Sequence, residues 1–385
     1  MSALALCSPH CGVSPETTSG GETYEREVLT RLGRDGVRVE LILARGKPHP
    51  LEVPNWTVHR FAIHRGLRWW VAPFVVPPAI RRVHREVGFD LLRVHSLRFI
   101  GPGALWARRR FKLDVPVVAH HHHLDPDPLN RVIEKRVVEA CDGVVVGSEF
   151  ARRQLAEALG VRTDHVAVAP YGVDARFTPR PARADLLARY GLGGGGPVAL
   201  FFGGLKPRKN LPLLLDVWAD VVRACPEARL LVAGGGPLLS ELQQRASTLG
   251  LGDRARFTGY VPEAEKAEHF NLGDVFVFPS AMEGFGLAVG EAMSSGLPVV
   301  ASDRGSIPEL LVDGEGGFLG DPARPVQFVE ALVRLLRDAP LRAKQGAANV
   351  ERVDRWFRWE RCVATTRAEY ERVVAAWRAR GGRVR

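Results

Sequence analysis

The feature of this sequence that most restricts its fold is an alternation of short apolar runs with longer amphipathic stretches, which occurs in both halves. Short runs that are apolar throughout are typical of strands buried in a parallel sheet, and the segments between them are long enough for helices. Each half therefore predicts repeated β-α-β units with right-handed connections. The predicted strands are 4–8, 37–44, 90–95, 116–120, 144–146 and 166–170, then 198–203, 229–233, 256–258, 275–279 and 298–302.

The length of the chain supports two domains. Its 385 residues exceed the ~150–200 residues that one hydrophobic core supports. We expect two Rossmann-like α/β domains, an N-terminal one over 1–178 and a C-terminal one over 179–361. The stretch 179–197 is rich in proline and glycine and includes four consecutive glycines, which cannot contribute a packed face. We expect the hinge there, with a cleft between the domains.

Composition indicates a folded protein of a reducing compartment. The first ten residues lack the positive n-region and the apolar h-region of a signal peptide. The longest apolar stretch, 69–80, is interrupted by three prolines and is shorter than the ~20 residues that cross a bilayer. Five cysteines without framework spacing, Cys7 and Cys11 among them, favour free thiols over disulfides. These features predict a cytoplasmic protein.

Positive charge is concentrated in residues 56–112, which hold 12 basic and 2 acidic residues in a chain of net charge +10. Aromatic residues are interleaved with the arginines, as in 68–70. Such a segment attracts anionic lipid or a phosphorylated substrate. No nucleic-acid-binding module can be read in the sequence, so we expect no nucleic-acid partner. Arginines on solvated helix faces are the alternative interpretation of this segment.

Two glutamates around a glycine-rich turn form a candidate site. Glu283 precedes a predicted helix, and Glu291 is expected about two turns inside it. At ~1.5 Å per residue they are ~12 Å apart, more than the ~5–9.5 Å between the carboxyls of a glycosidase. They suit hydroxyl groups at the two ends of an extended ligand. Backbone N–H groups between them offer an anion site, those of Gly284, Phe285, Gly286 and Leu287.

With its surroundings, this segment resembles glycosyltransferase family 4, whose mark is E-x(7)-E, here Glu283 to Glu291. The resemblance covers nearly the whole chain. It implies two Rossmann-like domains (the GT-B fold) facing across a cleft, with a C-terminal helix, about 362–385, that crosses back to the N-terminal domain. The other matching motifs are 19–21, 36–39, 89–96, 141–148, 171–174, 207–210, 232–237, 257–260, 308–311 and 357–360.

The resemblance implies a retaining hexosyltransferase. It would use a UDP- or GDP-sugar as co-substrate, with no bound metal and no other cofactor, and a glycan, lipid-linked or small-molecule acceptor held by the N-terminal domain. Residues 56–112 would then contact an anionic membrane peripherally, at its cytoplasmic face. Two other functions stay open at this point, a nucleotide-sugar epimerase-like enzyme of the same fold and a non-catalytic binder of anionic surfaces.

Without a metal, cations and helix N-termini must neutralise the departing diphosphate. By resemblance Lys209 is the diphosphate lysine, and Gly20 and Gly21 form the glycine loop that lies close to the phosphates. One departure from the family is Gly204, because many members carry arginine there. Arg208, or Lys206 with less support, is the expected replacement.

The resemblance assigns the remaining positions. Glu283 would hold donor-sugar hydroxyls and Glu291 the ribose hydroxyls. Tyr260 and Val261 would line the base pocket, with apolar packing as an equal alternative. For Glu309, helix capping and a donor contact are equally supported.

The run of four histidines at 120–123 follows a predicted strand. By the family spacing His122 lies next to the anomeric carbon, and it is a catalytic candidate together with Lys209 and Glu283. Histidine-rich tracts also bind metals. Adjacent side chains of an extended chain point to opposite faces, so four in a row cannot face one ion, and we expect no metal.

Overall fold

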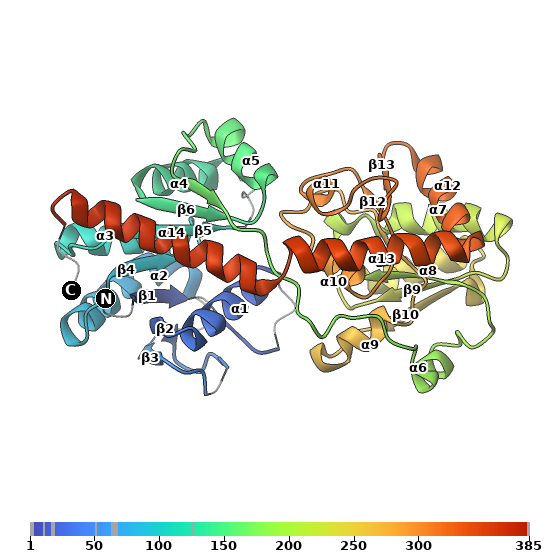
Figure 1. The fold of residues 1–385 in the computed structure, drawn as a ribbon, viewed down its shortest axis with the longest axis horizontal. Coiled ribbons are helices and arrows are strands. Elements are labelled where there is room, and N and C mark those ends of the chain that lie inside the picture. Colours follow the sequence, from blue (N-terminus) through green and yellow to red (C-terminus); the bar gives the residue numbers. More distant parts are fainter. Residues whose placement is uncertain are drawn as a thin grey trace. The chain divides into compact units, whose positions relative to one another are not determined.

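The computed structural model describes residues 4–10, 12–16, 20–50, 52–62, 68–122, 124 and 127–382. The chain forms two compact units, Met1–Tyr171 with Trp359–Arg385, and Gly172–Arg358 (Figure 1). Each unit is built on one parallel sheet. The predicted α/β class with two Rossmann-like domains is therefore confirmed.

The first unit contains a seven-stranded sheet in the order β3-β2-β1-β4-β5-β6-β7. Every residue of the central strand β1 is buried, including the polar residues Ser8 and His10. Helix α14 packs against α1 and beside β6 in this unit. The strands are β1 (Ala5–His10), β2 (Arg38–Ala44), β3 (Trp56–Phe61), β4 (Leu91–Val94), β5 (Val117–His121), β6 (Gly143–Val146) and β7 (Val166–Val168), and the helices are α1 (Gly20–Arg34), α2 (Arg68–Glu86), α3 (Gly101–Arg110), α4 (Pro128–Ala140), α5 (Glu149–Leu159) and α14 (Trp359–Ala379).

The second unit contains a six-stranded sheet in the order β10-β9-β8-β11-β12-β13. Its strands are β8 (Val198–Phe202), β9 (Arg229–Ala233), β10 (Ala255–Gly259), β11 (Val275–Phe278), β12 (Val299–Ser302) and β13 (Gly317–Gly320). Its helices are α6 (Ala184–Arg189), α7 (Leu211–Ala224), α8 (Leu239–Thr248), α9 (Lys266–Phe270), α10 (Leu287–Ser294), α11 (Ile307–Leu310), α12 (Pro325–Arg337) and α13 (Ala339–Trp356), with the 3-10 helices η1 (Pro207–Lys209), η2 (Gly252–Arg254) and η3 (Glu263–Glu265).

The strands β3 and β13 were not predicted from the sequence. The half-buried β3 carries polar residues and β13 begins and ends with glycine, so neither forms a continuous apolar run. Trp56 at the start of β3 is fixed instead by its indole N–H, which donates to the Leu29 carbonyl at 3.0 Å.

The division of the chain differs from the expected boundaries at 178/179 and 361/362. The chain first passes from one unit to the other between Tyr171 and Gly172. The glycine-rich stretch 179–197, where we expected the hinge, lies inside the second unit. Its backbone is held there, because the Arg180 N–H donates to Asn271 Oδ1 at 2.8 Å. The Val173 N–H donates to the Phe357 carbonyl at 2.7 Å, so the segments next to the two crossings are paired within the second unit.

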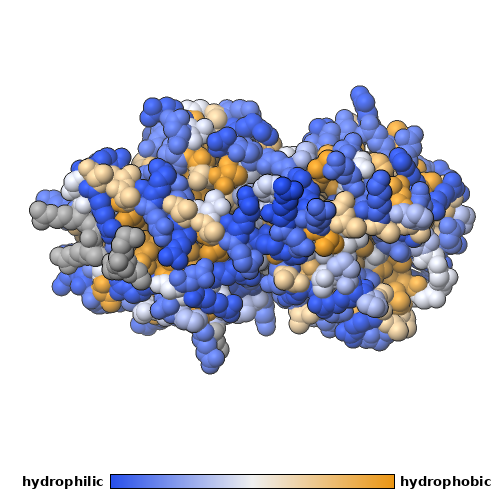
Figure 2. Space-filling view, in the orientation of Figure 1, coloured by the Kyte–Doolittle hydropathy of each residue, from blue (hydrophilic) through white to orange (hydrophobic). Residues whose placement is uncertain are grey.

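The apolar stretch 69–80 belongs to α2, which contains all three of its prolines. Within the described residues, no helix combines the length and the apolar character that a membrane crossing requires. In the view of Figure 2, hydrophilic residues cover most of the surface and apolar residues form separate patches. Cys7 is a buried free thiol, whereas Cys11 lies outside the described residues.

Candidate functional site

Lys209 and Glu283 meet beyond the carboxyl ends of two neighbouring strands of the second unit. Lys209 ends η1, which follows β8, and Glu283 follows β11, the strand next to β8 in the sheet. Loops at this edge of an open α/β sheet are where such folds bind ligands. Lys209 Nζ donates to Glu283 Oε1 at 2.7 Å and lies 4.4 Å from the centre of the Phe278 ring.

The carboxylate of Glu283 is the centre of a small polar cluster. Its Oε1 also accepts from Arg208 Nη1 and from Ser280 Oγ, both at 2.6 Å. Within the described residues its second oxygen, Oε2, accepts no hydrogen bond, so it is available to a hydroxyl group of a ligand. Burial alone would raise the pKa of Glu283, but the charges of Lys209 and Arg208 outweigh burial and lower this pKa below its ordinary value. The carboxylate therefore stays ionised at neutral pH.

Arg208, the expected replacement for the arginine missing at 204, contacts the carboxylate of Glu283. Its side chain is about half exposed, at 53%, and its guanidinium shares Glu283 Oε1 with Lys209. A Cβ atom added to Gly204 would have only Lys206 Cε within 4 Å, at 3.8 Å. The backbone at position 204 therefore has room for a Cβ atom.

Glu291 lies in α10 and is 5% exposed. Helix α10 begins at Leu287, so Glu291 is about one turn inside it and not two, and the spacing of ~12 Å, which assumed a continuous helical rise, does not describe this segment. Its Oε1 accepts from Lys266 Nζ at 2.6 Å, whereas its buried Oε2 has no partner within the described part of the chain. An unsatisfied buried oxygen is costly, and ribose hydroxyls would satisfy it.

The turn before α10 requires glycine at one position. Gly286 caps the helix with a φ of 91°, and a Cβ there would lie 2.6 Å from Ile307 Cδ1. Phe285 is buried and packs edge-on against Phe357, with 6.0 Å between ring centres. The segment from Gly284 to Leu287 is thus held in place at the N-terminus of α10, where a helix dipole favours an anion.

Tyr260 and Val261 follow β10 and differ in exposure. Tyr260 is 59% exposed, so it is not a core residue in this structure, whereas Val261 is buried at 8%. Apolar packing therefore explains Val261 but not Tyr260. Glu309 lies in the short helix α11, where its backbone carbonyl accepts from Arg352 at 2.9 Å.

The remaining candidates, Gly20, Gly21 and His122, lie in the first unit. Gly20 and Gly21 are the first residues of the 15-residue helix α1, and His122 directly follows β5. A Cβ added to Gly21 would lie 3.4 Å from His122 Cδ2, so Gly21 and this ring are neighbours. His120 bonds to Tyr24 and Tyr370, and His123 lies outside the described residues. Among the described residues, no group of three metal-ligating side chains is placed to hold an ion.

Comparison with known proteins identifies the chain. The family described as Glycosyltransferase Family 4 matches residues 18–177, and Glycosyl transferases group 1 matches residues 183–352. A D-inositol 3-phosphate glycosyltransferase of Kineococcus radiotolerans is 31% identical over 96% of this chain and 95% of its own length. The chain belongs to glycosyltransferase family 4. A phosphatidyl-myo-inositol mannosyltransferase of Mycobacterium leprae is also 31% identical, over 91% of this chain and 88% of its own.

Solved structures support the fold of this glycosyltransferase. A sucrose-phosphate synthase from Thermosynechococcus elongatus superposes with a TM-score of 0.82 over 97% of this chain and 100% of its own, at 22% identity. Anabaena HepE in complex with UDP has a TM-score of 0.79 over 96% and 100% of the two chains, at 20% identity. The predicted family, the two-domain fold and the activity of a glycosyltransferase with a nucleotide-sugar donor are confirmed.

Three residues of this glycosyltransferase that sequence reasoning did not select contact the candidates. Lys266 pairs with Glu291, Ser280 donates to Glu283, and Glu25 accepts from His122 Nε2 at 3.0 Å. For Ser280, proximity to Glu283 in the sequence was an available signal. For Lys266 and Glu25 no local motif marks the contact, because their partners lie 25 and 97 positions away.

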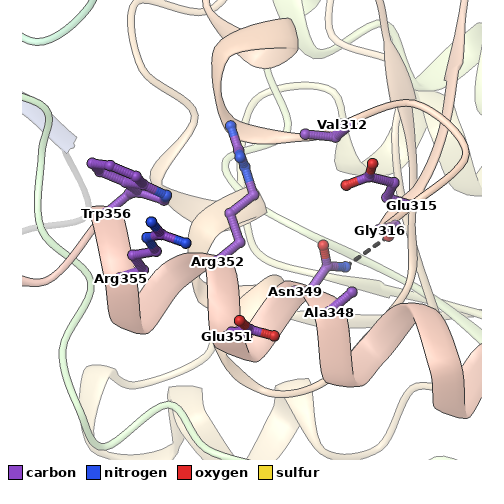
Figure 3. A pocket seen from close by; sticks show the side chains of 9 residues that line it. All are labelled: Val312, Glu315, Gly316, Ala348, Asn349, Glu351, Arg352, Arg355 and Trp356. Carbon is purple, nitrogen blue, oxygen red and sulfur yellow. Dashed lines mark hydrogen bonds between the residues drawn. The ribbon is translucent and has the colours of Figure 1, made fainter.

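A pocket of about 220 Å³ lies in the second unit, between α13 and the loop before β13 (Figure 3). Its wall includes the guanidinium groups of Arg352 and Arg355 and the indole of Trp356. None of the predicted site residues lines it. Arg352 secures α11 by donating from Nε to the Leu310 carbonyl at 2.5 Å, so this part of the wall is structural.

Buried histidines predict that this glycosyltransferase loses stability in weak acid. Burial is the largest influence on the pKa values of His10 and His120 and lowers both, so these rings take up protons less readily in the folded chain than in the unfolded chain. In the unfolded chain they take up protons below about pH 6.5, so each is expected to remove up to about 1.4 kcal/mol of stability per pH unit below that value. Urea unfolding between pH 7.5 and 5 measures this slope. His120→Gln should reduce this slope by up to about 1.4 kcal/mol per pH unit, which corresponds to one proton. An unchanged slope would mean that His120 does not cause the loss of stability.

Proposed function

We propose that this glycosyltransferase transfers a hexose, with retention of anomeric configuration, from a UDP- or GDP-sugar to an acceptor that carries a phosphorylated inositol. The observation that carries the donor side is the cluster at Glu283, where Lys209 and Arg208 converge on one carboxylate oxygen and leave the other available. The acceptor is inferred from the relatives, whose names specify inositol 3-phosphate and phosphatidyl-myo-inositol.

Each donor group has a matching side chain in this proposal. Lys209 and Arg208 neutralise the diphosphate, which gains charge as the bond to the sugar breaks, together with helix N-termini such as that of α10. Glu283 Oε2 accepts from the sugar hydroxyls and Glu291 Oε2 from the ribose hydroxyls. Val261 and Tyr260 line the base, and Gly20 and Gly21 admit the phosphates to the first turn of α1. No metal takes part in this scheme.

The test is a screen for sugar release. Purified protein is incubated with UDP-, GDP- and ADP-sugars, with and without inositol 3-phosphate or phosphatidylinositol vesicles, in buffer containing EDTA. We expect slow hydrolysis of one donor alone, faster consumption with an acceptor, and no effect of EDTA. Epimerised donor without transfer would support the epimerase-like alternative, to which the relatives give no support. Failure to bind any nucleotide diphosphate would support a non-catalytic binder.

Arg208→Ala is expected to lower kcat by less than the loss of Lys209, because Arg208 is half exposed and water screens its charge. The nucleotide-diphosphate affinity of Arg208→Ala should also fall, because Arg208 also interacts with the negative charge that the bound diphosphate carries before the reaction. Steady-state kinetics on the preferred donor measure both. Arg223→Ala, on an exposed arginine of α7, is the matched control. Equal kinetics of Arg208→Ala and the control would mean that position 208 does not replace the arginine absent at 204.

We propose that the segment 56–112 brings this enzyme to the anionic, cytoplasmic face of a membrane. Helices α2 and α3 pack together and expose Phe74 and Trp106. The side chains of 68–70, where the sequence shows an arginine and two tryptophans, lie outside the described residues. Arg81, Arg82 and Arg85 on α2 and Arg109 and Arg110 on α3 are exposed.

Co-sedimentation with phosphatidylinositol-containing vesicles tests this surface. Each basic residue near an anionic membrane contributes about 1 kcal/mol, so binding should be strong at low salt and weak at high salt. Changing Arg81, Arg82 and Arg85 to Gln should abolish most of it. The matched control changes the exposed Arg162, Arg183 and Arg223 to Gln. Binding that ignores both salt and the α2 substitutions would leave a soluble acceptor as the better proposal.

A further inference from the structure

A buried ion pair lies in the first unit next to His122. Glu25 of α1 and Arg93 of β4 are 1% and 0% exposed, and Arg93 Nη1 donates to Glu25 Oε2. Arg93 is itself fixed, because its Nε donates to the Tyr370 hydroxyl at 2.6 Å. A buried carboxylate without such a partner would be strongly destabilising. The pair thus presents an oriented carboxylate at a fixed place.

The second oxygen of this carboxylate is directed to His122. Glu25 Oε1 lies 3.0 Å from His122 Nε2, and the Tyr171 hydroxyl bonds to His122 Nδ1. A carboxylate only accepts, so Nε2 must carry a proton, and in the neutral ring Nδ1 then accepts from Tyr171. Both ring nitrogens are therefore engaged by the protein, and the Cδ2 edge is turned toward Gly21.

Glu25 remains an acceptor over the whole neutral range. Burial raises its pKa, but the charge of Arg93 and the hydrogen bonds from His10 and His122 outweigh burial and hold this pKa well below its ordinary value. His10 Nε2 lies 3.3 Å from Glu25 Oε2, so the same carboxylate also orients a second ring. One buried charge therefore fixes several groups around β1 and β5.

We propose that Glu25 is a positioning residue, which holds the His122 ring in one tautomer and one orientation against Gly21. His122 then contacts the donor sugar through its backbone and its carbon edge, and neither ring nitrogen takes part. This rests on the proposed function, in which His122 adjoins the sugar. The role of a ring held in this way is to shape the site and exclude water around the anomeric centre.

The chain offers a matched control for this proposal. Glu40 of β2 is also buried, at 1% exposed, and also holds a histidine, with Oε2 2.7 Å from His59 Nε2. Glu40→Gln and Glu25→Gln therefore make the same chemical change at two buried glutamates of one unit, each of which contacts a histidine. Only Glu25→Gln is expected to change catalysis.

The experiment compares three readouts in wild type, Glu25→Gln and Glu40→Gln. Sugar release from the preferred donor should fall about 10- to 100-fold in Glu25→Gln, as expected for a displaced active-site group. The nucleotide-diphosphate affinity should stay within twofold, because Lys209 and Glu291 are unchanged. Nitrogen-15 NMR of His122, assigned with His122→Gln, should show the Nε2–H tautomer in wild type and a mixture of tautomers in Glu25→Gln, whose amide can donate or accept.

Equal activity of the two Gln variants, or an unchanged His122 tautomer in Glu25→Gln, would overturn the proposal. If Glu25→Gln does not fold, Tyr171→Phe removes only the hydroxyl at Nδ1 and should keep the Nε2–H tautomer, because Glu25 still accepts from Nε2. A Tyr171→Phe protein that loses the Nε2–H tautomer would overturn the proposal as well, because Tyr171 and not Glu25 would then set it. Absence of sugar release from wild type would contradict the proposed function, and the NMR comparison would still decide whether Glu25 sets the tautomer.

Discussion

Replacing Lys209 with alanine is expected to lower kcat for sugar transfer by about 10²–10³-fold, the size of the loss when one preorganised donor to a developing anion is removed. The ammonium group is buried, held by Glu283 at 2.7 Å, and needs no reorganisation when the diphosphate departs. Charge grows on the diphosphate in the transition state, so kcat should fall more than nucleotide affinity. Steady-state and single-turnover kinetics on the preferred donor separate the two.

The control for Lys209→Ala is Lys206→Ala, three positions earlier in the same loop. Lys206 is exposed and has no hydrogen bond to Glu283. Its loss should leave kcat within about twofold of wild type, since a solvent-exposed charge contributes little at this range. If Lys209→Ala retains more than a tenth of wild-type kcat, the diphosphate is stabilised by other groups.

Glu291→Ala is expected to weaken nucleotide-diphosphate binding by about 2–3 kcal/mol, or roughly 30- to 150-fold, because two ribose hydroxyls lose their charged acceptor. Burial raises the pKa of Glu291, with Lys266 opposing. The ionised carboxylate is the form that accepts both hydroxyls, so wild-type affinity should fall as the pH is lowered from neutral. Calorimetric titrations from pH 7.5 to 5 measure both effects.

Glu330→Ala, on an exposed glutamate of α12, is the control for Glu291. It should bind as wild type does at every pH. Glu291→Ala should lose the acid dependence as well as the affinity, because the titrating group is gone. Wild-type affinity in Glu291→Ala would show that the ribose hydroxyls bind elsewhere.

The central strands of both sheets could be predicted because strands buried on both faces are largely apolar, and β8 and β11 are apolar throughout. The strands β3 and β13 could not, since β3 is partly exposed and carries polar residues and β13 begins and ends with glycine. The domain crossing at Tyr171 was also missed. Glycine content marks conformational freedom, whereas the crossing is set by which unit each segment packs against.

For the candidate site, the sequence predicted individual residues but not the contacts between them. Motif spacing selected Lys209 and Glu283, and the order of β8 beside β11 explains why they meet. That order is not readable from distances along the chain. The contacts of Glu25 with His122 and of Lys266 with Glu291 depend wholly on tertiary packing. Sequence therefore selected the candidate donor-binding residues, and the structure shows the side chains that contact them.

The most direct test of the central claim is the anomeric configuration of the transfer product. An α-linked nucleotide sugar, chosen by the donor screen, is incubated with the protein and with inositol 3-phosphate or phosphatidylinositol, and the new linkage is determined by proton NMR. We predict an α-linked product that forms with release of nucleotide diphosphate and that decreases about 10²–10³-fold in Lys209→Ala. A β-linked product, or a protein that consumes none of the UDP-, GDP- and ADP-sugars, would contradict a retaining transferase built on Glu283, Lys209 and Arg208.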